Sequence, residues 1–388
     1  MRVLAVCDYL SSASGGGAER VAREVNRRLA DEHDVDLLAV GLAPRGAPTV
    51  SEPLGGYQVV KISGHDLSRA LGIQLAVSAG ARGAVRRELD RFCPDIVHAH
   101  GMYFQGSVAA AAAARSADVP FVVTAHIGSS RFLPEPARRA VQLWDYTVGR
   151  RVLGSASAIV AISPSVASHL GDLGVNSDRL VSTVNGVDHS VFHPGVQNAG
   201  GPLEVVFLGR LIANKGPDVA LEAFARLRSA GYRARLTFMG DGPLRQRLER
   251  RSRRLGVGED VSFAGLVSDV AGRLRNFHVL IRPSRTEGMP LAVLEAMASG
   301  VVVACSAIPG NLDLVRPEHN GLAFPVGDAA AAAGALRRLT VDESLYTRLR
   351  GAALCDAKRF TWQATATAHL EAFRRALSMP LSQRAAPR

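Results

Sequence analysis

The sequence predicts an α/β protein with two Rossmann-like, doubly wound domains. Short apolar segments without polar alternation follow one another along the chain, separated by segments of helical periodicity. Such apolar runs are typical of parallel strands that are covered on both faces of a sheet. The series restarts after a turn-rich stretch at residues 198–202. The chain has 388 residues, too many for one ordinary core and enough for two domains of about 150–200 residues each.

The first series covers residues 1–195, which we expect to form the N-terminal domain. Strands are expected at residues 3–7, 35–40, 96–98, 121–124 and 158–162, and a helix at 18–30. Residues 41–56 are rich in glycine and proline, which predicts a loop. Residues 135–153 have the spacing of an amphipathic helix. Packing of this helix against the core is favoured over its resting on a membrane surface.

The second series covers residues 203–360, which we expect to form the C-terminal domain. Strands are expected at residues 203–208, 234–239, 261–263, 279–281 and 301–304, and a helix at 217–230. A further helix is expected at 361–378. We expect the remaining tail, residues 379–388, to be frayed.

Composition excludes several classes of protein. Hydrophobic residues make up 47% and charged residues 21% of the chain, which excludes global disorder. The longest weakly polar stretch, residues 296–310, is shorter than the roughly 18–20 residues of a membrane span. The four cysteines form no CxxC pair, as expected for reduced thiols. We therefore expect a soluble, cytoplasmic protein, and peripheral contact at the inner membrane face stays open.

The net charge is +11. It favours anionic partners such as nucleotides, phosphorylated substrates and acidic lipid surfaces. Only three of the 46 basic residues are lysine, so a genomic bias towards arginine is the favoured explanation of the charge.

The strongest functional signal lies in residues 283–300, where a strand is followed by a helix expected at residues 290–299. Pro290 fits the first helical position and Gly300 fits the helix end. Glu287 precedes this helix, and Glu295 lies inside it. The start of a helix binds anions or hydroxyl oxygens, and two carboxylates can accept hydrogen bonds from vicinal sugar hydroxyls. A surface helix with a capping loop is the alternative.

Two loops could bind phosphate. Arg210 and Lys215 follow the first strand of the second series, and two cations in one loop suit a diphosphate. The loop lacks the Walker A pattern, so a P-loop ATPase is not supported. Gly16 and Gly17 follow the first strand of the chain and permit close approach of a ligand to the backbone. The alternatives are a solvated basic loop and a tight turn.

Histidines gather near expected strand ends, at His98, His100 and His126. His-x-His could bind a metal ion, but no third ligand has suitable spacing, so no metal and no cofactor are expected. His126 could instead donate a hydrogen bond to a substrate oxygen. A packed, hydrogen-bonded histidine is the alternative.

Together these motifs resemble the retaining glycosyltransferases of family GT4 (group 1), which have the GT-B fold. The resemblance covers nearly the whole chain. The motifs that carry it are the Gly-rich turn near Gly16, Thr-Ala-His126, Ile162-Ser-Pro-Ser, Val184-Asn-Gly-Val-Asp188, Gly209-Arg-Leu with Lys215-Gly, Gly240-Asp-Gly-Pro243, Phe263-Ala-Gly-Leu-Val267, and Glu287 with Glu295. The two glutamates match the E-x7-E signature of the family. Two segments depart from the common pattern of the family. Met289-Pro290 stands where an aromatic residue and glycine are common, and Pro290 suits the start of a helix. Pro309-Gly-Asn-Leu-Asp313 carries a shorter carboxylate than the common Gly-Gly-x-x-Glu.

The resemblance implies two lobes facing each other across a cleft, with the nucleotide-sugar donor mainly on the C-terminal lobe. It also implies that the helix at 361–378 crosses back to the N-terminal domain. For the donor, the resemblance implies that Arg210 and Lys215 bind the diphosphate, that Glu295 binds the ribose and that Val267 lies near the base. It implies that the donor sugar is held by Glu287 and by the amides of Gly288, Met289 and Leu291. In the N-terminal domain, it implies that Gly16 and Gly17 approach the phosphate or the acceptor and that His126 approaches the sugar.

The implied reaction is metal-independent hexosyl transfer with retention at the anomeric carbon. The donor is a nucleoside-diphosphate sugar, with a UDP-sugar weakly favoured. The acceptor is a sugar, a polyprenyl- or lipid-linked glycan, or a small natural product. The acceptor should bind to N-terminal loops at residues 64–74, 101–106 and 127–136. Two alternatives stay open: a sugar-nucleotide epimerase of the same fold, and a basic protein that binds nucleic acid or a membrane surface. Sparse aromatic residues weigh against nucleic acid as a partner.

Overall fold

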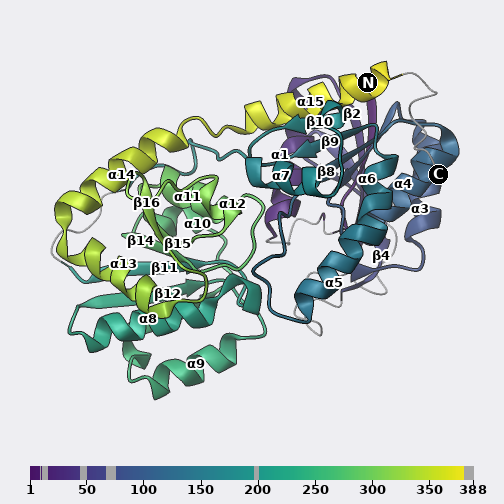
Figure 1. Ribbon diagram of the computed structural model, residues 1–388. Coiled ribbons are helices and arrows are strands. Elements are labelled where there is room, and N and C mark those ends of the chain that lie inside the picture. Colours follow the sequence, from purple (N-terminus) through teal and green to yellow (C-terminus); the bar gives the residue numbers. More distant parts are fainter. Residues whose placement is uncertain (9, 11–15, 44–49, 67–75, 196–200, 380–388) are drawn as a thin grey trace. The chain divides into compact units, whose positions relative to one another are not determined.

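The computed structural model describes residues 1–8, 10, 16–43, 50–66, 76–195 and 201–379. The chain divides into two units (Figure 1). The first comprises residues 1–130, 134–185 and 362 onwards, and the second comprises residues 131–133 and 186–361. The frayed tail that the sequence predicts lies outside the described residues, except for Met379.

The first unit contains a sheet that, over the described residues, has eight strands in the order β10-β9-β8-β7-β1-β2-β4-β3. All neighbours are parallel except β3 and β4. The strands are β1 (Arg2–Val6), β2 (Asp36–Ala43), β3 (Val50–Leu54), β4 (Tyr57–Ser63), β7 (Ile96–His100), β8 (Phe121–Ala125), β9 (Ala158–Ala161) and β10 (Leu180–Ser182). β5 (His65–Asp66) and β6 (Ala76–Val77) form a separate antiparallel pair. The chain order reverses between β1 and β7, and ligands bind beside such a switch point in open α/β sheets.

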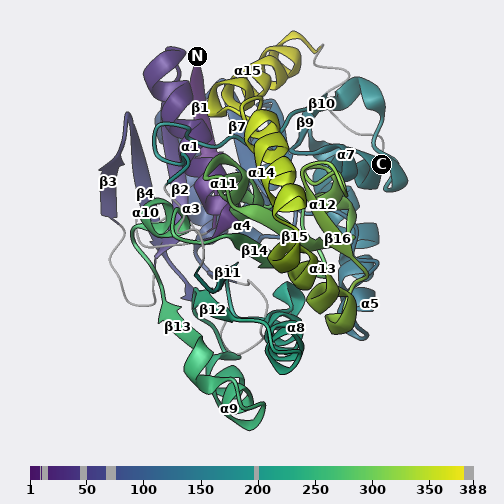
Figure 2. The same cartoon turned by 90° about the vertical axis from the view of Figure 1, so that its left-hand side faces the viewer.

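Several helices of the first unit pack in pairs beside this sheet. α1 contacts α15, and α3 contacts α4; Figure 2 shows α1 and α15 side by side, as does Figure 1. The helices are α1 (Gly17–Glu32), α3 (Ala81–Phe92), α4 (Gln105–Ala117), α5 (Ala137–Trp144), α6 (Arg150–Ser155), α7 (Pro164–Asp172) and α15 (Trp362–Ser378), and a π-helical turn (Asp145–Gly149) joins α5 to α6. α7 begins after Ser163, whose hydroxyl accepts a hydrogen bond from the N–H of Val166.

The second unit contains a parallel sheet that, in the described part of the chain, has six strands in the order β13-β12-β11-β14-β15-β16. Numbered within the unit, this is 3-2-1-4-5-6, the strand order of the Rossmann fold. The strands are β11 (Leu203–Leu208), β12 (Ala234–Met239), β13 (Val261–Gly265), β14 (Val279–Arg282), β15 (Val302–Ser306) and β16 (Gly321–Phe324). The switch point lies between β11 and β14.

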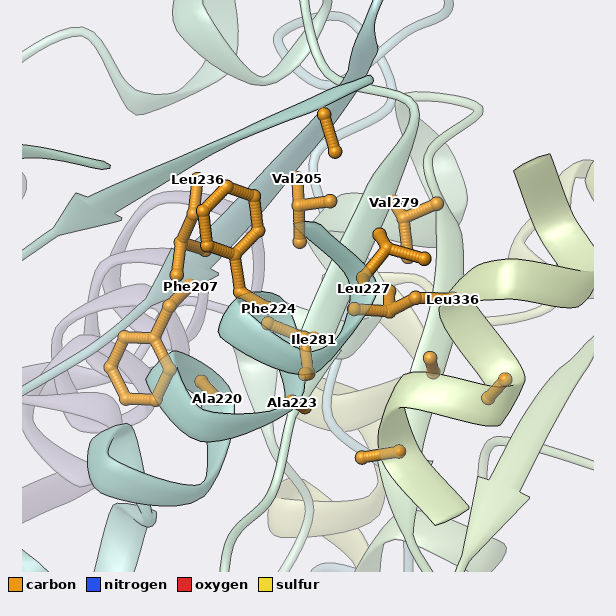
Figure 3. Close-up of a cluster of buried hydrophobic side chains, with 14 of the residues drawn as sticks. Val205, Phe207, Ala220, Ala223, Phe224, Leu227, Leu236, Val279, Ile281 and Leu336 are labelled. Atoms are coloured by element: carbon orange, nitrogen blue, oxygen red, sulfur yellow. The ribbon is translucent and has the colours of Figure 1, made fainter. Parts of the chain in front are cut away.

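The helices of the second unit are α8 (Pro217–Ser229), α9 (Arg245–Arg254), α10 (Val270–Leu274), α11 (Leu291–Ala298), α12 (Pro309–Leu312), α13 (Ala329–Val341) and α14 (Glu343–Ala357), with single 3-10 turns at Ala213–Lys215 and Gly258–Asp260. α8 and α13 lie side by side on one face of the sheet. Figure 3 shows part of this core, where Leu236 lies beside the ring of Phe224 of α8 and the ring of Phe207 lies near Ala220 of the same helix. The apolar residues of each strand exclude water on this face. β11 and β14 pair in parallel, with Val205 opposite Val279 and Val206 opposite Leu280.

The structure corrects three local predictions. The predicted loop at residues 41–56 contains β3, which pairs antiparallel with β4. α11 begins at Leu291, and Pro290 is its N-cap residue rather than its first helical residue. α5 contains no buried residue, and Leu143 is 67% exposed. The predicted helix at 135–153 also includes the π-helical turn and α6, in which Val152 and Leu153 are buried. The prediction of core packing is therefore wrong for α5 and confirmed for α6.

Candidate functional site

Two loops meet at the switch point of the second unit. One follows β11 and carries Arg210 and Lys215, and the other follows β14 and carries Glu287. The N–H of Arg285 donates to the carbonyl of Asn214 over 2.8 Å, which joins the loops. Gly216 has φ +66°, and a Cβ there would lie 2.2 Å from the carbonyl oxygen of Pro283. Only glycine permits this approach of the two backbones.

Lys215 and Glu287 form an ion pair in this site. The Nζ of Lys215 lies 2.7 Å from Oε2 of Glu287. Burial lowers the pKa of Lys215 to about 8, although the carboxylate of Glu287 opposes the shift. Burial also acts to raise the pKa of Glu287, but Arg282 and Lys215 together lower it to about 2. The carboxylate is therefore charged at neutral pH and held by cations.

Arg282 is a site residue that the sequence analysis missed. It is the last residue of β14 and is 5% exposed. Its Nη2 donates to Oε1 of Glu287 over 2.6 Å, and its Nη1 donates to the carbonyl of Leu208 over 2.6 Å. Gly209 has φ +145°, and a Cβ there would lie 2.8 Å from Nη1. Its place next to Pro283 at the end of an apolar strand is the one sequence signal that could have identified it.

The other residues predicted on this unit lie around the same loop. Gly288 and Met289 are buried just before α11, Leu291 is its first residue, and Glu295 is 4% exposed on the next turn. Arg210 is partly buried two residues after β11. Val267 is partly buried in the segment between β13 and α10. The fold thus brings cations and carboxylates from distant segments to one end of a Rossmann sheet.

Gly310 is needed for the backbone position of Glu287. A Cβ at Gly310 would lie 2.4 Å from the carbonyl oxygen of Glu287 and 2.7 Å from that of Gly288. We expect Gly310→Ala to displace this loop and to lower the free energy of unfolding by about 1–3 kcal/mol, as overpacking does. Chemical denaturation measures this change. In the matched control Gly351→Ala, on an exposed position of α14, the new Cβ meets no atom within 4 Å, so stability should rise slightly. Equal effects of both variants would contradict the predicted clash.

In the first unit, Gly16 is the N-cap residue of α1. Its N–H donates to Oε2 of Glu19 over 3.0 Å, and a Cβ at Gly16 would lie 2.7 Å from this oxygen. A Cβ at Gly17 would meet no atom within 4 Å. At the start of α1, the side chain of Glu19 therefore lies against Gly16, whereas the space beside Gly17 is empty. Gly15 lies outside the described residues.

Four histidines form a buried cluster in the first unit: His98, His100, His126 and His369. Nδ1 of His369 lies 2.7 Å from the carbonyl oxygen of Thr365, which can only accept, so this nitrogen carries the proton. Nε2 of His369 then accepts from the hydroxyl of Thr124 over 3.1 Å. The hydroxyl oxygen of Thr124 in turn accepts from Nε2 of His98 over 2.8 Å. These bonds attach α15 to β7 and β8.

His126 lies beside this chain of hydrogen bonds. Its Nε2 is 3.3 Å from Nδ1 of His100, and the two rings stack with centroids 5.5 Å apart. Burial lowers the pKa of all four histidines, to about 3 for His126 and about 4 for His369. The cluster is therefore neutral at physiological pH, and its members are hydrogen-bonding groups rather than cations.

This cluster predicts a loss of stability in acid. The unfolded chain, with histidine pKa values near 6.5, binds more protons than the folded chain below that pH. The free energy of unfolding should therefore fall as the pH drops from about 7 to 5, by up to about 1.4 kcal/mol per pH unit for each histidine. Asp8 has the opposite effect on the free energy of unfolding, because burial raises its pKa to about 7. Its single contribution is smaller than that of the four histidines together. Urea unfolding at several pH values measures the slope, which should be shallower in His369→Gln. A midpoint independent of pH would refute this.

Asp8 is another residue that the sequence analysis missed. It lies two residues after β1, is 3% exposed, and accepts the N–H of Gly106 at the start of α4 over 2.9 Å. It therefore stabilises the switch point of the first unit. Its position at the end of an apolar run was the only available sequence signal.

The described residues contain no group of three histidine, cysteine, aspartate or glutamate side chains arranged to hold a metal ion. Within the same part of the chain, no helix has the length and apolarity needed to cross a membrane.

Two family models match the chain. The one described as "Glycosyltransferase Family 4" matches residues 15–191, and the one described as "Glycosyl transferases group 1" matches residues 191–354.

Curated relatives agree with these matches. The D-inositol 3-phosphate glycosyltransferase of Acidothermus cellulolyticus is 32% identical, over 73% of this chain and 68% of the relative. A GDP-mannose-dependent alpha-(1-6)-phosphatidylinositol dimannoside mannosyltransferase of Mycobacterium tuberculosis is 27% identical over 95% of both chains.

Solved structures share the fold. Sucrose-phosphate synthase from Thermosynechococcus elongatus has a TM-score of 0.80 at 19% identity, covering 96% of this chain and 98% of that one. Anabaena HepE in complex with UDP-glucose has a TM-score of 0.76 at 18% identity, covering 98% of this chain and 100% of the other. The two-domain α/β fold with parallel sheets that the sequence predicts is confirmed.

Proposed function

This chain belongs to the family 4, group 1 glycosyltransferases, and on that premise we propose that it transfers a hexosyl group from a nucleoside-diphosphate sugar to an acceptor hydroxyl, with retention and without a metal ion. The observation that carries the proposal is the group formed by Lys215, Glu287 and Arg282 at the switch point of a Rossmann sheet. Such switch points are where nucleotides bind.

The donor would bind along the loops after β11 and β14. Arg210 and Lys215 would bind the diphosphate, because both lie in the loop that follows β11. Glu287 and the amides of Gly288, Met289 and Leu291 would hold the sugar. Glu295 would accept hydrogen bonds from the ribose hydroxyls, and Val267 would lie near the base. UDP and GDP are both candidates for the nucleotide, since HepE was solved with UDP-glucose and the mycobacterial relative is named as GDP-mannose-dependent.

The first unit would bind the acceptor and complete the reaction centre. His126 would contribute a neutral hydrogen-bonding group near the sugar, since burial holds its pKa at about 3. Gly17 would allow a ligand to approach the start of α1, where a Cβ would meet no atom. The mycobacterial relative is named for a phosphatidylinositol dimannoside acceptor, so a lipid-linked or sugar acceptor and peripheral membrane contact are part of the proposal. We also propose a cytoplasmic location.

The mechanism follows from the charges in the second unit. Departure of the nucleoside diphosphate places new negative charge on its terminal phosphate, and Arg210 and Lys215 would stabilise it. These cations would replace a metal ion in that role. The leaving phosphate would then accept the proton of the acceptor hydroxyl on the same face of the sugar, which preserves the anomeric configuration. The bond from the anomeric carbon to the phosphate oxygen breaks as the bond to the acceptor oxygen forms.

A thermal-shift screen against UDP, GDP, ADP and dTDP tests the donor class. A ligand that binds the folded chain alone raises the melting temperature by linkage. The nucleotide that raises it selects the sugar donors for a transfer assay, in which product analysis separates transfer from epimerisation without acceptor. If no nucleoside diphosphate shifts the melting temperature, the proposed donor class is wrong.

A further inference from the structure

Arg282 carries a buried charge on the strand next to the proposed phosphate loop. A buried guanidinium requires a partner, because desolvation of an unpaired charge is costly. Its partners are the carboxylate of Glu287 and the carbonyl of Leu208, the last residue of β11. Arg282 therefore connects the loop that carries Glu287 to the start of the loop that carries Lys215.

Glu287 has one cation on each carboxylate oxygen. Arg282 binds Oε1 over 2.6 Å and Lys215 binds Oε2 over 2.7 Å. One negative charge thus pairs with two positive charges, so either cation alone is sufficient to neutralise Glu287. The carboxylate does not need both.

The two cations differ in how firmly they are held. Arg282 has a second hydrogen bond to the backbone, and Gly209 packs against its guanidinium. Its planar group is always charged and fits a carboxylate in a fixed geometry. Lys215 is a point charge on a flexible stem, and its side chain is 15% exposed, compared with 6% for Arg282. Lys215 is therefore the cation that can leave the carboxylate.

We propose that Arg282 is a positioning residue that keeps Glu287 paired while Lys215 moves from this carboxylate to the diphosphate of the donor. The inference rests on the proposed function. The ion pair seen in the structure is one of two positions of Lys215. Arg282 neutralises Glu287 in both, so the exchange leaves no buried anion unpaired.

The consequence is a dependence of phosphate binding on a residue that does not contact phosphate. In the Arg282→Met variant, Lys215 is the only cation left to pair with Glu287. Lys215 therefore stays on this carboxylate and does not bind the diphosphate. Adding Glu287→Gln removes the negative charge that keeps Lys215 in this position. A purely structural role of Arg282 would not be rescued by this second change.

The test is calorimetric titration of the full chain with the nucleoside diphosphate that raises its melting temperature, because this probe lacks the sugar that Glu287 would hold. We expect Arg282→Met and Lys215→Met each to weaken binding by at least about tenfold, the size of one charge-assisted hydrogen bond. The double variant Arg282→Met with Glu287→Gln should recover to within about threefold of the wild type, under half the free energy of a tenfold change. Arg282→Lys should bind nearly normally, because it keeps the charge.

Controls keep the inference falsifiable. Arg247→Met removes one positive charge from an exposed position of α9, outside both loops, and should leave binding unchanged. If Arg282→Met does not fold, Arg282→Gln replaces it in both the single and the double variant. Normal binding by the single variant, or a double variant as weak as the single one, would overturn the inference and leave the proposed function standing. A wild-type chain that binds no nucleoside diphosphate would overturn both.

Discussion

Replacing Glu287 with alanine is expected to lower the free energy of unfolding by about 3–5 kcal/mol, the typical effect of breaking a buried ion pair. The variant leaves the charges of Lys215 and Arg282 close together without their carboxylate. Deprotonation of Lys215, whose pKa is already lowered to about 8 by burial, relieves part of the repulsion between the two cations. Chemical denaturation of the full chain measures the decrease in the free energy of unfolding.

The matched control for this variant is Glu249→Ala. Glu249 pairs with Arg245 on α9, and both side chains are 35% exposed. Exposed pairs contribute roughly 0–1 kcal/mol, so the control should unfold almost as the wild type does. Similar losses in both variants would mean that Glu287 is no more tightly coupled to its cations than a surface residue.

Lys215→Ala is expected to lower kcat/KM by more than about tenfold, on the order of 1.4 kcal/mol of transition-state stabilisation. The ammonium is proposed to bind the phosphate on which charge develops as the donor bond breaks. Stability should change less than in the Glu287 variant, because Arg282 remains to pair with Glu287. The measurement is a transfer assay with the donor whose nucleotide raises the melting temperature.

Lys358→Ala is the control for this prediction, because Lys358 is the other lysine of the second unit and is exposed beyond α14. Turnover of this variant should equal that of the wild type. Near-normal turnover of Lys215→Ala would remove Lys215 from the proposed role, and its pairing with Glu287 would then be structural only.

Most strands and helices of this chain could be predicted because they have strong local patterns. β11 and β12 were predicted with their observed bounds, and α8 was predicted to within one residue. Buried parallel strands are continuous apolar runs, which is a signal within a few residues of sequence. β3 lacked such a signal. It contains Glu52 and Pro53 and is held by its antiparallel partner, β4.

The contacts of the site could not be predicted to the same extent. Glu287, Lys215 and Arg210 were identified by motif, but the pairing of Lys215 with Glu287 spans 72 residues and depends on the switch point between β11 and β14. Arg282 has no motif of its own, because its role comes from the carbonyl and the carboxylate that the fold brings to it. His369 was missed for the same reason, since its partner Thr124 lies 245 residues earlier.

The helix α15 determines when the first unit can finish folding during translation. Its buried face, which includes Trp362, His369 and Phe373, packs on α1 and on strands of the first unit. That unit therefore cannot cover its sheet until residues 362–378 have been synthesised, whereas residues 186–361 of the second unit are contiguous and precede them. The first unit, which contains the N-terminus, is thus the unit that completes its fold last. A truncation before Trp362 should expose apolar surface on the first unit and leave the second intact.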